Sequence, residues 1–187
     1  MCSRFEINAP KDQMARLFGA RFDGQDYPTG ERRPTNACLV FTKDSAGTLS
    51  WGIPAPWDGK PLINARLETV AEKPTFRPYL EKPCVVPATA YFEWRKTETG
   101  QRLRNRIALA ADPLFGFAGL HDGTHFTILT RAPAPTIAHI HTRMPVILAA
   151  GDLEPWLTGR MTPGTSGPAP GTLTADEERP PQGDLFG

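Results

Sequence analysis

Along the first 160 residues, short apolar runs alternate with polar segments that contain Pro, Gly and Asp, and long helical periods are few. Short runs rich in β-branched and aromatic residues favour strands. We predict strands at residues 37–41, 48–53, 84–87, 90–94, 107–110, 115–120 and 124–130. Helical spacing predicts helices at residues 11–20, 64–70, 135–140 and 151–157. This pattern indicates an α+β fold with a mainly antiparallel, partly barrel-like β core and a few short flanking helices.

The composition changes near Met161. Residues 161–187 contain five Pro and five Gly, and they have almost no apolar side chain before the last three residues. Such a segment cannot bury enough surface to offset the entropy lost on ordering. We therefore expect one folded domain over residues 1–160, and a disordered Pro/Gly-rich tail over residues 161–187.

A chain of 187 residues is long enough for one domain with its own hydrophobic core. It has no apolar run near the ~18 residues that span a membrane, and its first residues lack the apolar segment of a secretory signal. Its three cysteines, at positions 2, 38 and 84, form no CxxC pair. We therefore expect a cytoplasmic protein without disulfides, in which Cys38 and Cys84 are inert core residues.

The net charge of +1 is unevenly distributed along the chain. Residues 1–160 carry 20 Lys and Arg against 16 Asp and Glu, whereas residues 161–187 carry one Arg against four acidic residues. A mildly basic body is compatible with a polyanionic partner, but many domains without such a partner have a similar charge. Charge alone therefore does not decide the function.

Cys2 directly follows the initiator methionine. Methionine aminopeptidases remove Met1 when residue 2 is small, and the product here would carry a free α-amine beside a thiol. An α-amine has a pKa of ~7.7–8.0, so part of it is neutral and nucleophilic at pH 7. Such an amine can form a Schiff base with an aldehyde, and the thiol can then close a thiazolidine ring. The alternative is a chance cysteine at position 2.

Three further segments contain residues that this chemistry could use. Asn64 follows a Gly-Lys-Pro turn, and a buried Asn can fix a polar substrate group. Glu93 lies in the aromatic segment 91–94, where burial should raise its pKa and suit it to acid–base catalysis. A buried ion pair with an Arg is the alternative for Glu93. His141 precedes a strand-like apolar run.

In order along the chain, the segments MCSRF, NARLET, CVVPATAYFEW and HTRMPVIL resemble the motifs of the SRAP family (SOS response-associated peptidases, also called abasic site processing proteins). The family pattern is Met-Cys-Gly-Arg, then Asn-Ala-Arg-x-Glu, then Pro-Ala with Tyr/Phe-Glu-Trp, then His-x-Arg-Met-Pro. The resemblance runs from residue 1 to about residue 157. Ser3 stands where Gly is usual and Thr142 where an acidic residue is common, but neither change removes a catalytic group.

The resemblance implies an SRAP-like catalytic domain over residues 1–160 that binds abasic sites in single-stranded DNA and protects them during replication. It would do so by lyase-like Schiff-base chemistry that ends in a covalent thiazolidine crosslink. Cys2 would be the nucleophile attached to the abasic sugar, and Asn64 would position both. Glu93 would act as acid and base during ring opening and Schiff-base formation. His141 would transfer protons, including those needed for reversal.

The same resemblance implies DNA contacts. The candidate phosphate contacts are Arg4, Arg66, Arg77 and Arg143. Trp51 would stack on a base, as aromatic residues do in single-strand binders, unless it is a core residue. His139 lies two residues before His141, but no third ligand is nearby in the sequence, so we expect neither a metal nor another cofactor.

The end of the chain, QGDLFG, resembles the QLxLF-type peptides that dock bacterial repair proteins on the replicative sliding clamp. The contacting residues would be Gln182, Leu185 and Phe186. A tether with such a peptide would raise the local concentration of the domain at stalled forks. The alternative is a terminus without function, because Gly183 replaces the usual Leu.

Two other functions stay open at this point. One is a cysteine autopeptidase in which Cys2 and His141 remove the residue before Cys2. The other is a non-catalytic single-stranded DNA-binding module in which Cys2 is incidental. The sequence gives no evidence on oligomeric state, so a monomer is the default, and we expect association with the nucleoid only through bound DNA.

Overall fold

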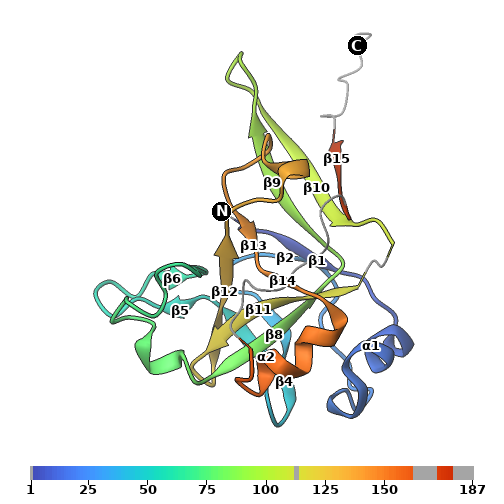
Figure 1. The fold of residues 1–187 in the computed structure, drawn as a ribbon, viewed down its shortest axis with the longest axis vertical. Helices are drawn as coiled ribbons and strands as arrows, with labels where there is room; N and C mark the ends of the chain where they lie inside the picture. The colour runs from blue at the N-terminus through green and yellow to red at the C-terminus, as the bar shows by residue number, and fades with distance from the viewer. Residues whose placement is uncertain (1, 112–113, 162–171, 179–187) are drawn as a thin grey trace, which may run out of the picture.

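The chain forms two main sheets in a computed structural model that describes residues 2–111, 114–161 and 172–178 (Figure 1). The larger sheet has the strand order β13 (Met144–Pro145), β12 (His125–Arg131), β4 (Ala46–Trp51), β3 (Ala37–Phe41), β8 (Pro83–Ala88), β11 (Phe115–His121) and β14 (Ile147–Leu148), and β7 (Asn64–Arg66) pairs with β12. The smaller sheet has the order β15 (Leu173–Glu178), β10 (Arg102–Leu109), β9 (Ala90–Lys96), β1 (Phe5–Ile7) and β2 (Gly30–Arg32). A separate short ribbon pairs β5 (Ile53–Pro54) with β6 (Pro61–Leu62).

Helices are short and lie outside the sheets. The α-helices are α1 (Lys11–Phe18) and α2 (Leu153–Leu157), and the 3₁₀ turns are η1 (Gly19–Arg21), η2 (Arg77–Tyr79), η3 (Pro135–Ile137) and η4 (Ala150–Asp152). Helix α1 buries Met14 and Phe18, which stand one turn apart, and the Phe18 ring stacks on Phe41 of β3 at a centroid distance of 3.9 Å. None of the helices in the described ranges is long and apolar enough to cross a membrane.

The larger sheet closes on itself. Strand β12 pairs with both β11 and β4, so β12, β4, β3, β8 and β11 form a five-stranded barrel. Closure brings β11 very close to β12 at Gly119, where a Cβ atom would lie 2.7 Å from the carbonyl oxygen of Thr127. Only glycine fits there without a shift of the backbone. The fold class predicted from the sequence is confirmed, although β12 pairs in parallel with β4 and β7.

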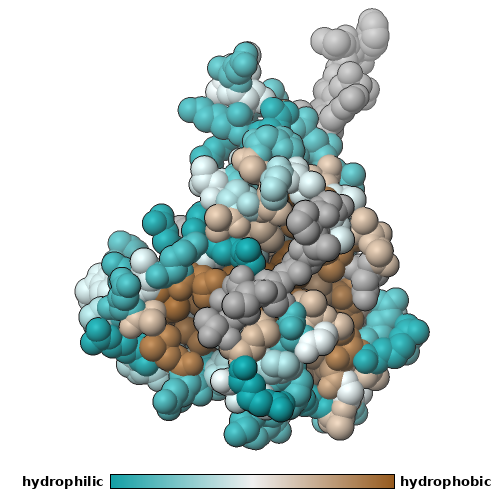
Figure 2. Space-filling view, viewed as in Figure 1, coloured by the Kyte–Doolittle hydropathy of each residue, from teal (hydrophilic) through white to brown (hydrophobic). Residues whose placement is uncertain are grey.

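The chain passes from the barrel directly into the smaller sheet between β8 and β9. Strand β8 belongs to the barrel and β9 to the smaller sheet, with only Thr89 between them. The β9–β10 hairpin extends away from the barrel with β15 at its side (Figure 1). This extension is hydrophilic, whereas apolar residues are exposed lower on the same face (Figure 2). The junction between the two sheets is therefore the place where a polar surface meets the core.

Aromatic side chains fill the core beneath this junction. Phe5 of β1 packs edge-on against Trp51 at 5.1 Å and against Phe117 at 5.8 Å between ring centroids. Trp51 is fully buried, and its ring lies 6.3 Å from that of Phe126. Cys2 belongs to the same cluster of buried residues. The amino-terminal strand is thus anchored by Phe5, three residues after Cys2.

Most predicted strands are confirmed, but one predicted helix is wrong. Residues 64–70 begin with strand β7 and continue as turns, because the backbone of β7 pairs with Ile128–Thr130 of β12 and this tertiary pairing overrides the local helical pattern. Of the helix predicted at residues 135–140, only the 3₁₀ turn Pro135–Ile137 forms.

The tail also differs in part from the prediction. Strand β15 lies within residues 161–187, where composition predicted disorder. It pairs along β10, buries Leu173 and forms an ion pair between Glu177 and Arg95. The edge of β10 supplies backbone partners that the tail's own composition could not reveal. The predicted clamp-binding residues at 182–187 lie outside the described residues.

Candidate active site

Cys2 lies just before β1 and is 1% exposed. Its Sγ donates a long hydrogen bond of 3.5 Å to the carbonyl oxygen of Arg4. Burial raises the pKa of the Cys2 thiol far above its ordinary value, and the negative charge of Glu93 raises it further. The resting thiol is therefore protonated, and it needs a nearby base before it can act as a nucleophile.

Asn64 holds the backbone of Cys2. Its Nδ2 donates a hydrogen bond of 2.7 Å to the carbonyl oxygen of Cys2, across 62 positions of sequence. Asn64 reaches this point because β7 pairs with β12, opposite Ile128. Its Oδ1 is buried and has no hydrogen-bond partner among the described residues, so an acceptor is available for a substrate hydroxyl or amine.

Glu93 is a buried carboxyl group at the junction of the sheets. It is 3% exposed on β9, and Asn105 of β10, also 3% exposed, stands directly opposite it. Burial raises the pKa of Glu93 to about 7. A carboxyl group with this pKa is partly protonated at neutral pH, so it can both donate and accept protons.

His141 is the fourth residue of the candidate site, and it lies in the segment just before β13. Its Nε2 lies 3.8 Å from Oε2 of Glu93. On the other side of the ring, Nδ1 lies 3.0 Å from the backbone nitrogen and 3.1 Å from the carbonyl oxygen of Arg143. The peptide groups of Arg143 thus offer Nδ1 both a donor and an acceptor, which suits either protonation state. Burial lowers the pKa of His141, so the neutral ring is favoured.

The structure therefore brings the four residues that we selected from separate segments into one site. Asn64 touches Cys2, Glu93 acts electrostatically on Cys2, and His141 faces Glu93. The arrangement combines a buried thiol, a proton-exchanging carboxyl group and an imidazole. It can support addition to a carbonyl carbon with proton transfer.

The candidate DNA-contact residues differ from one another in exposure and in ion pairing. Arg66 and Arg77 are exposed. Arg4 forms an ion pair with Glu31 at 3.1 Å, and its guanidinium lies over the Trp94 ring at 5.3 Å. The other two candidates, Arg143 and Trp51, form hydrogen bonds with other parts of the protein.

Arg143 is engaged by neighbouring groups, and the stacking role expected of Trp51 is corrected. The Arg143 guanidinium donates to both carboxylate oxygens of Glu68, at 2.8 and 2.7 Å, and to the carbonyl oxygen of Thr130 at 2.6 Å. The guanidinium is thus engaged by Glu68 and Thr130, and the role of Arg143 as a phosphate contact stays a prediction. Trp51 is fully buried and donates through Nε1 to the carbonyl oxygen of Ile63 at 2.9 Å, so it is a core residue and cannot stack on a base.

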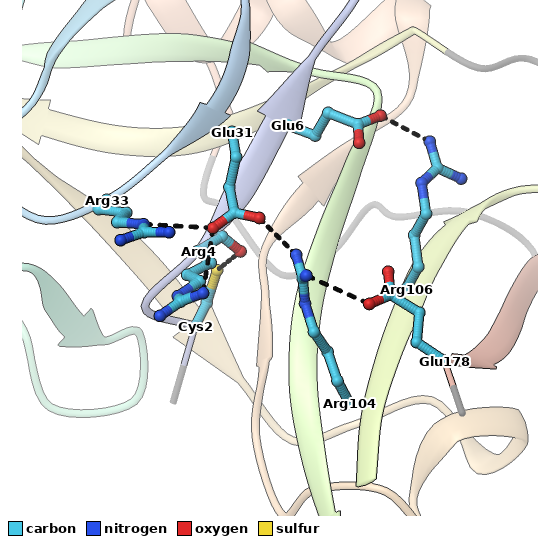
Figure 3. Close-up of polar contacts among 8 residues, drawn as sticks. All are labelled: Cys2, Arg4, Glu6, Glu31, Arg33, Arg104, Arg106 and Glu178. Carbon is cyan, nitrogen blue, oxygen red and sulfur yellow. Dashed lines mark hydrogen bonds and ion pairs between the residues drawn. The ribbon is translucent and has the colours of Figure 1, made fainter. Parts of the chain in front are cut away.

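A network of arginines and glutamates beside Cys2 was missed by the sequence reasoning (Figure 3). Glu31 of β2 accepts from Arg4, Arg33 and Arg104. Further ion pairs join Arg104 to Glu178 and Arg106 to Glu6. The available signal was the period-two spacing of Arg102, Arg104 and Arg106, which places three arginines on one face of β10.

Metal binding finds no support in the described parts of the chain. No group of three or more His, Cys, Asp or Glu side chains lies close enough there to hold a metal ion. His139, which neighbours His141 in sequence, is exposed.

Comparisons with known proteins identify the family of this chain. A sequence model of the family described as SOS response associated peptidase (SRAP) matches residues 1–173. The chain is 35% identical to the abasic site processing protein YoaM of Bacillus subtilis, over 87% of this chain and 81% of that protein. It is 31% identical to the abasic site processing protein YedK of Escherichia coli, over 84% of this chain and 79% of that protein.

Solved structures share the fold. A crystal structure of a Bordetella bronchiseptica protein matches with a TM-score of 0.78 and 24% identity, over 95% of this chain and all of that chain. A Bacteroides thetaiotaomicron protein matches with the same TM-score and identity, over 95% of this chain and 92% of that chain. At this level of identity, the likeness establishes the architecture alone.

Proposed function

The chain belongs to the SOS response-associated peptidase (SRAP) family, and from this premise we propose that it is an abasic site processing protein. In this proposal it binds single-stranded DNA and crosslinks the ring-opened abasic sugar to Cys2 as a thiazolidine, which protects the lesion during replication. The observation that carries the proposal is the contact of Asn64 with Cys2, beside a carboxyl group whose pKa is about 7.

The proposed reaction uses both nucleophiles of the amino-terminal cysteine. After Met1 is removed, the α-amine attacks the aldehyde carbon C1′ and water leaves, which produces a Schiff base. The sulfur then adds to the same carbon and closes the five-membered ring. Because the amine and thiol share one residue, closure is intramolecular and has the advantage of a high effective concentration.

Glu93 is suited to both proton transfers. In its protonated form it can donate to the oxygen that leaves as water. In its ionised form it can accept the proton of the Cys2 thiol, whose high pKa makes such a base necessary. One carboxyl group with a pKa near neutrality can therefore serve the two steps in sequence.

Asn64 and His141 have supporting roles in this proposal. Asn64 fixes the carbonyl of Cys2 and offers its buried Oδ1 to the sugar or the amine. His141 exchanges protons with Glu93 across the 3.8 Å that separates Nε2 from Oε2, including during reversal of the crosslink. Arg4, and the exposed Arg66 and Arg77, would contact phosphates.

An autopeptidase is less compatible with the electrostatics of the site. A cysteine peptidase needs a thiolate, and its histidine lowers the pKa of the thiol. Here burial and Glu93 raise the pKa of Cys2 instead, and His141 faces Glu93. These observations favour reaction through the amine first.

One gel experiment tests the proposal. The purified protein is mixed with a single-stranded uracil-containing oligonucleotide treated with uracil glycosylase, and the products are run on a denaturing gel without borohydride. We expect a heat-stable shifted band that is absent with Cys2→Ala and weak on an intact duplex. A band that persists with Cys2→Ala would exclude the thiazolidine. Binding that is lost at high salt and leaves no covalent product would favour a non-catalytic binding module.

A further inference from the structure

Tyr91 is a buried polar residue beside the reactive groups. It lies on β9 two residues before Glu93, so both side chains point to the same face of the sheet. It is fully buried in the cluster that contains Cys2, and its ring packs edge-on against Phe117 at a centroid distance of 6.1 Å. Its hydroxyl has no hydrogen-bond partner among the residues that the structure describes.

The environment of this hydroxyl keeps it protonated. Burial raises the pKa of Tyr91 well above its ordinary value, and the charged forms of Cys2 and Glu93 raise it further. The Tyr91 side chain shares one buried cluster with Cys2 and one face of β9 with Glu93. The site thus holds a hydroxyl donor whose hydrogen is unused in the resting structure.

An unused buried hydroxyl is unfavourable for folding. A phenylalanine would fill the same space without the loss of a hydrogen bond to water. Tyr27 shows the usual arrangement, because its hydroxyl donates to the carbonyl oxygen of Ala9. A buried polar group without a partner needs an explanation, and a catalytic or ligand-binding role is one such explanation. Tyr91 therefore calls for a functional explanation.

We propose that Tyr91 is a further catalytic residue, whose hydroxyl donates a hydrogen bond to the sulfur of Cys2 while the thiazolidine ring closes. This inference rests on the proposed function and adds one group to it. It assigns a task to a hydroxyl that the steps described above leave unused.

The chemistry of closure explains why a donor is needed at that moment. The bond between Sγ and the Schiff-base carbon forms, the π electron pair of the C=N bond moves to nitrogen, and the thiol proton reaches that nitrogen through Glu93. During this transfer the sulfur carries negative charge in a buried position. The product sulfur is a neutral thioether and a weak acceptor. The hydrogen bond is therefore strongest in the transition state, as catalysis requires.

The other described groups around Cys2 are less suited to supply this hydrogen bond. Glu93 of β9 carries negative charge, and the carbonyl of Arg4 accepts rather than donates. One N–H of Asn64 Nδ2 donates to the Cys2 carbonyl, and Nε2 of His141 faces Glu93. The phenol of Tyr91 is a hydroxyl donor in the same buried cluster as Cys2, and it has no hydrogen-bond partner among the described residues.

Tyr91→Phe tests the proposal, with Tyr27→Phe as the matched control. In single-turnover reactions with the abasic oligonucleotide, we expect Tyr91→Phe to slow the borohydride-independent crosslink by about tenfold or more, the effect of losing a hydrogen bond to a charged group. The Schiff base trapped by borohydride should form at the wild-type rate. Tyr91→Phe should unfold at the same temperature as the wild type or higher, whereas Tyr27→Phe should unfold earlier and crosslink normally.

A second measurement does not depend on DNA. The rate at which iodoacetamide alkylates Cys2 is followed by mass spectrometry of the amino-terminal peptide at several alkaline pH values. We expect slower alkylation in Tyr91→Phe at each pH and no change in Tyr27→Phe. Equal alkylation rates in wild type and Tyr91→Phe would overturn the inference, as would a Tyr91→Phe variant that is destabilised like Tyr27→Phe. Absence of any crosslink with the wild type would count against the proposed function, and the alkylation rates would still decide the role of Tyr91.

Discussion

The guanidinium of Arg143 and the carboxylate of Glu68 form a bidentate ion pair, with nitrogen–oxygen distances of 2.8 and 2.7 Å. The pair spans strand β12, because Glu68 follows β7 and Arg143 precedes β13, and both of these strands pair with β12. One ion pair thereby connects the segment that carries Asn64 with the segment that carries His141. We expect this ion pair to help position these two residues.

Glu68→Gln should weaken this connection. We expect slower crosslinking, because both Asn64 and His141 lose a fixed position, together with a loss of about 0.5–1 kcal/mol in the free energy of unfolding at pH 7, since Glu68 is half exposed. Hydrogen bonds from Arg143 lower the pKa of Glu68 from 4.5 to about 2. The contribution of the pair is therefore complete above pH 4.5 and is lost as the pH falls toward 2.

Urea unfolding of wild type and Glu68→Gln at several pH values checks this prediction. The two midpoints should differ at pH 7 and converge near pH 2. Glu72→Gln removes a neighbouring exposed carboxylate for which no ion pair is found in the described residues, and it should leave the midpoint unchanged. A constant difference between wild type and Glu68→Gln at all pH values would contradict the assignment.

Glu93→Gln should separate stability from activity. Burial raises the pKa of Glu93 in the folded state from 4.5 to about 7. The carboxyl group therefore ionises at a lower pH in the unfolded chain than in the folded protein, and it destabilises the fold increasingly between pH 4.5 and 7. Removing the charge should stabilise the protein by on the order of 2 kcal/mol at pH 8 and very little at pH 4. Crosslinking should fall by ~10²-fold or more, because the acid and base are lost.

Thermal unfolding and single-turnover gels at pH 4, 6 and 8 measure both effects. Glu98→Gln changes an exposed glutamate in the β9–β10 turn and should alter neither property. Crosslinking by Glu93→Gln at the wild-type rate would remove Glu93 from the reaction.

Exposure of the amino group of Cys2 should control the crosslink. A protein with a cleavable amino-terminal extension, designed so that cleavage leaves Cys2 as the first residue, should form no thiazolidine before cleavage and react fully afterwards. The reason is that an amide nitrogen is not nucleophilic. A denaturing gel of the same preparation before and after cleavage measures this. An equally strong crosslink in the uncleaved protein would show that the thiol reacts without the amine.

Trp51→Phe should affect stability rather than DNA binding. Trp51 is fully buried and its Nε1 donates to the Ile63 carbonyl, so we expect a loss of ~2–3 kcal/mol in the free energy of unfolding. Trp57, which is 67% exposed, provides the control, since Trp57→Phe should leave stability unchanged. Fluorescence-detected titration with single-stranded DNA should give wild-type affinity for folded Trp51→Phe. A selective loss of affinity would restore the stacking interpretation.

Deleting residues 182–187 tests the proposed clamp contact. We expect the shortened protein to lose co-migration with the sliding clamp in size-exclusion chromatography and to crosslink DNA at the wild-type rate, because the four site residues are unchanged. Substituting Leu185 and Phe186 by Ala should have the same effect. Unchanged co-migration after the deletion would end the clamp proposal.

The local sequence was sufficient to select the candidate site residues. In the proposed reaction Cys2 acts through its amine once Met1 is removed, and this depends on its position directly after Met1. The strand that carries Glu93 is readable from its run of aromatic and β-branched residues. His141 and Asn64 could be selected because each lies in a short motif whose order along the chain matches a family. These inferences require no knowledge of contacts.

The tertiary structure decided the properties that depend on contacts between distant segments of the chain. The long-range pairing of β7 with β12 turned a predicted helix into a strand and brought Asn64 to Cys2. Arg143 is bound by Glu68, and Trp51 lies in the core rather than at a surface. The buried hydroxyl of Tyr91 could not be distinguished from an ordinary aromatic residue in the sequence. Burial and hydrogen-bond partners arise from contacts between distant parts of the chain, and those contacts decide which polar groups are available for reaction.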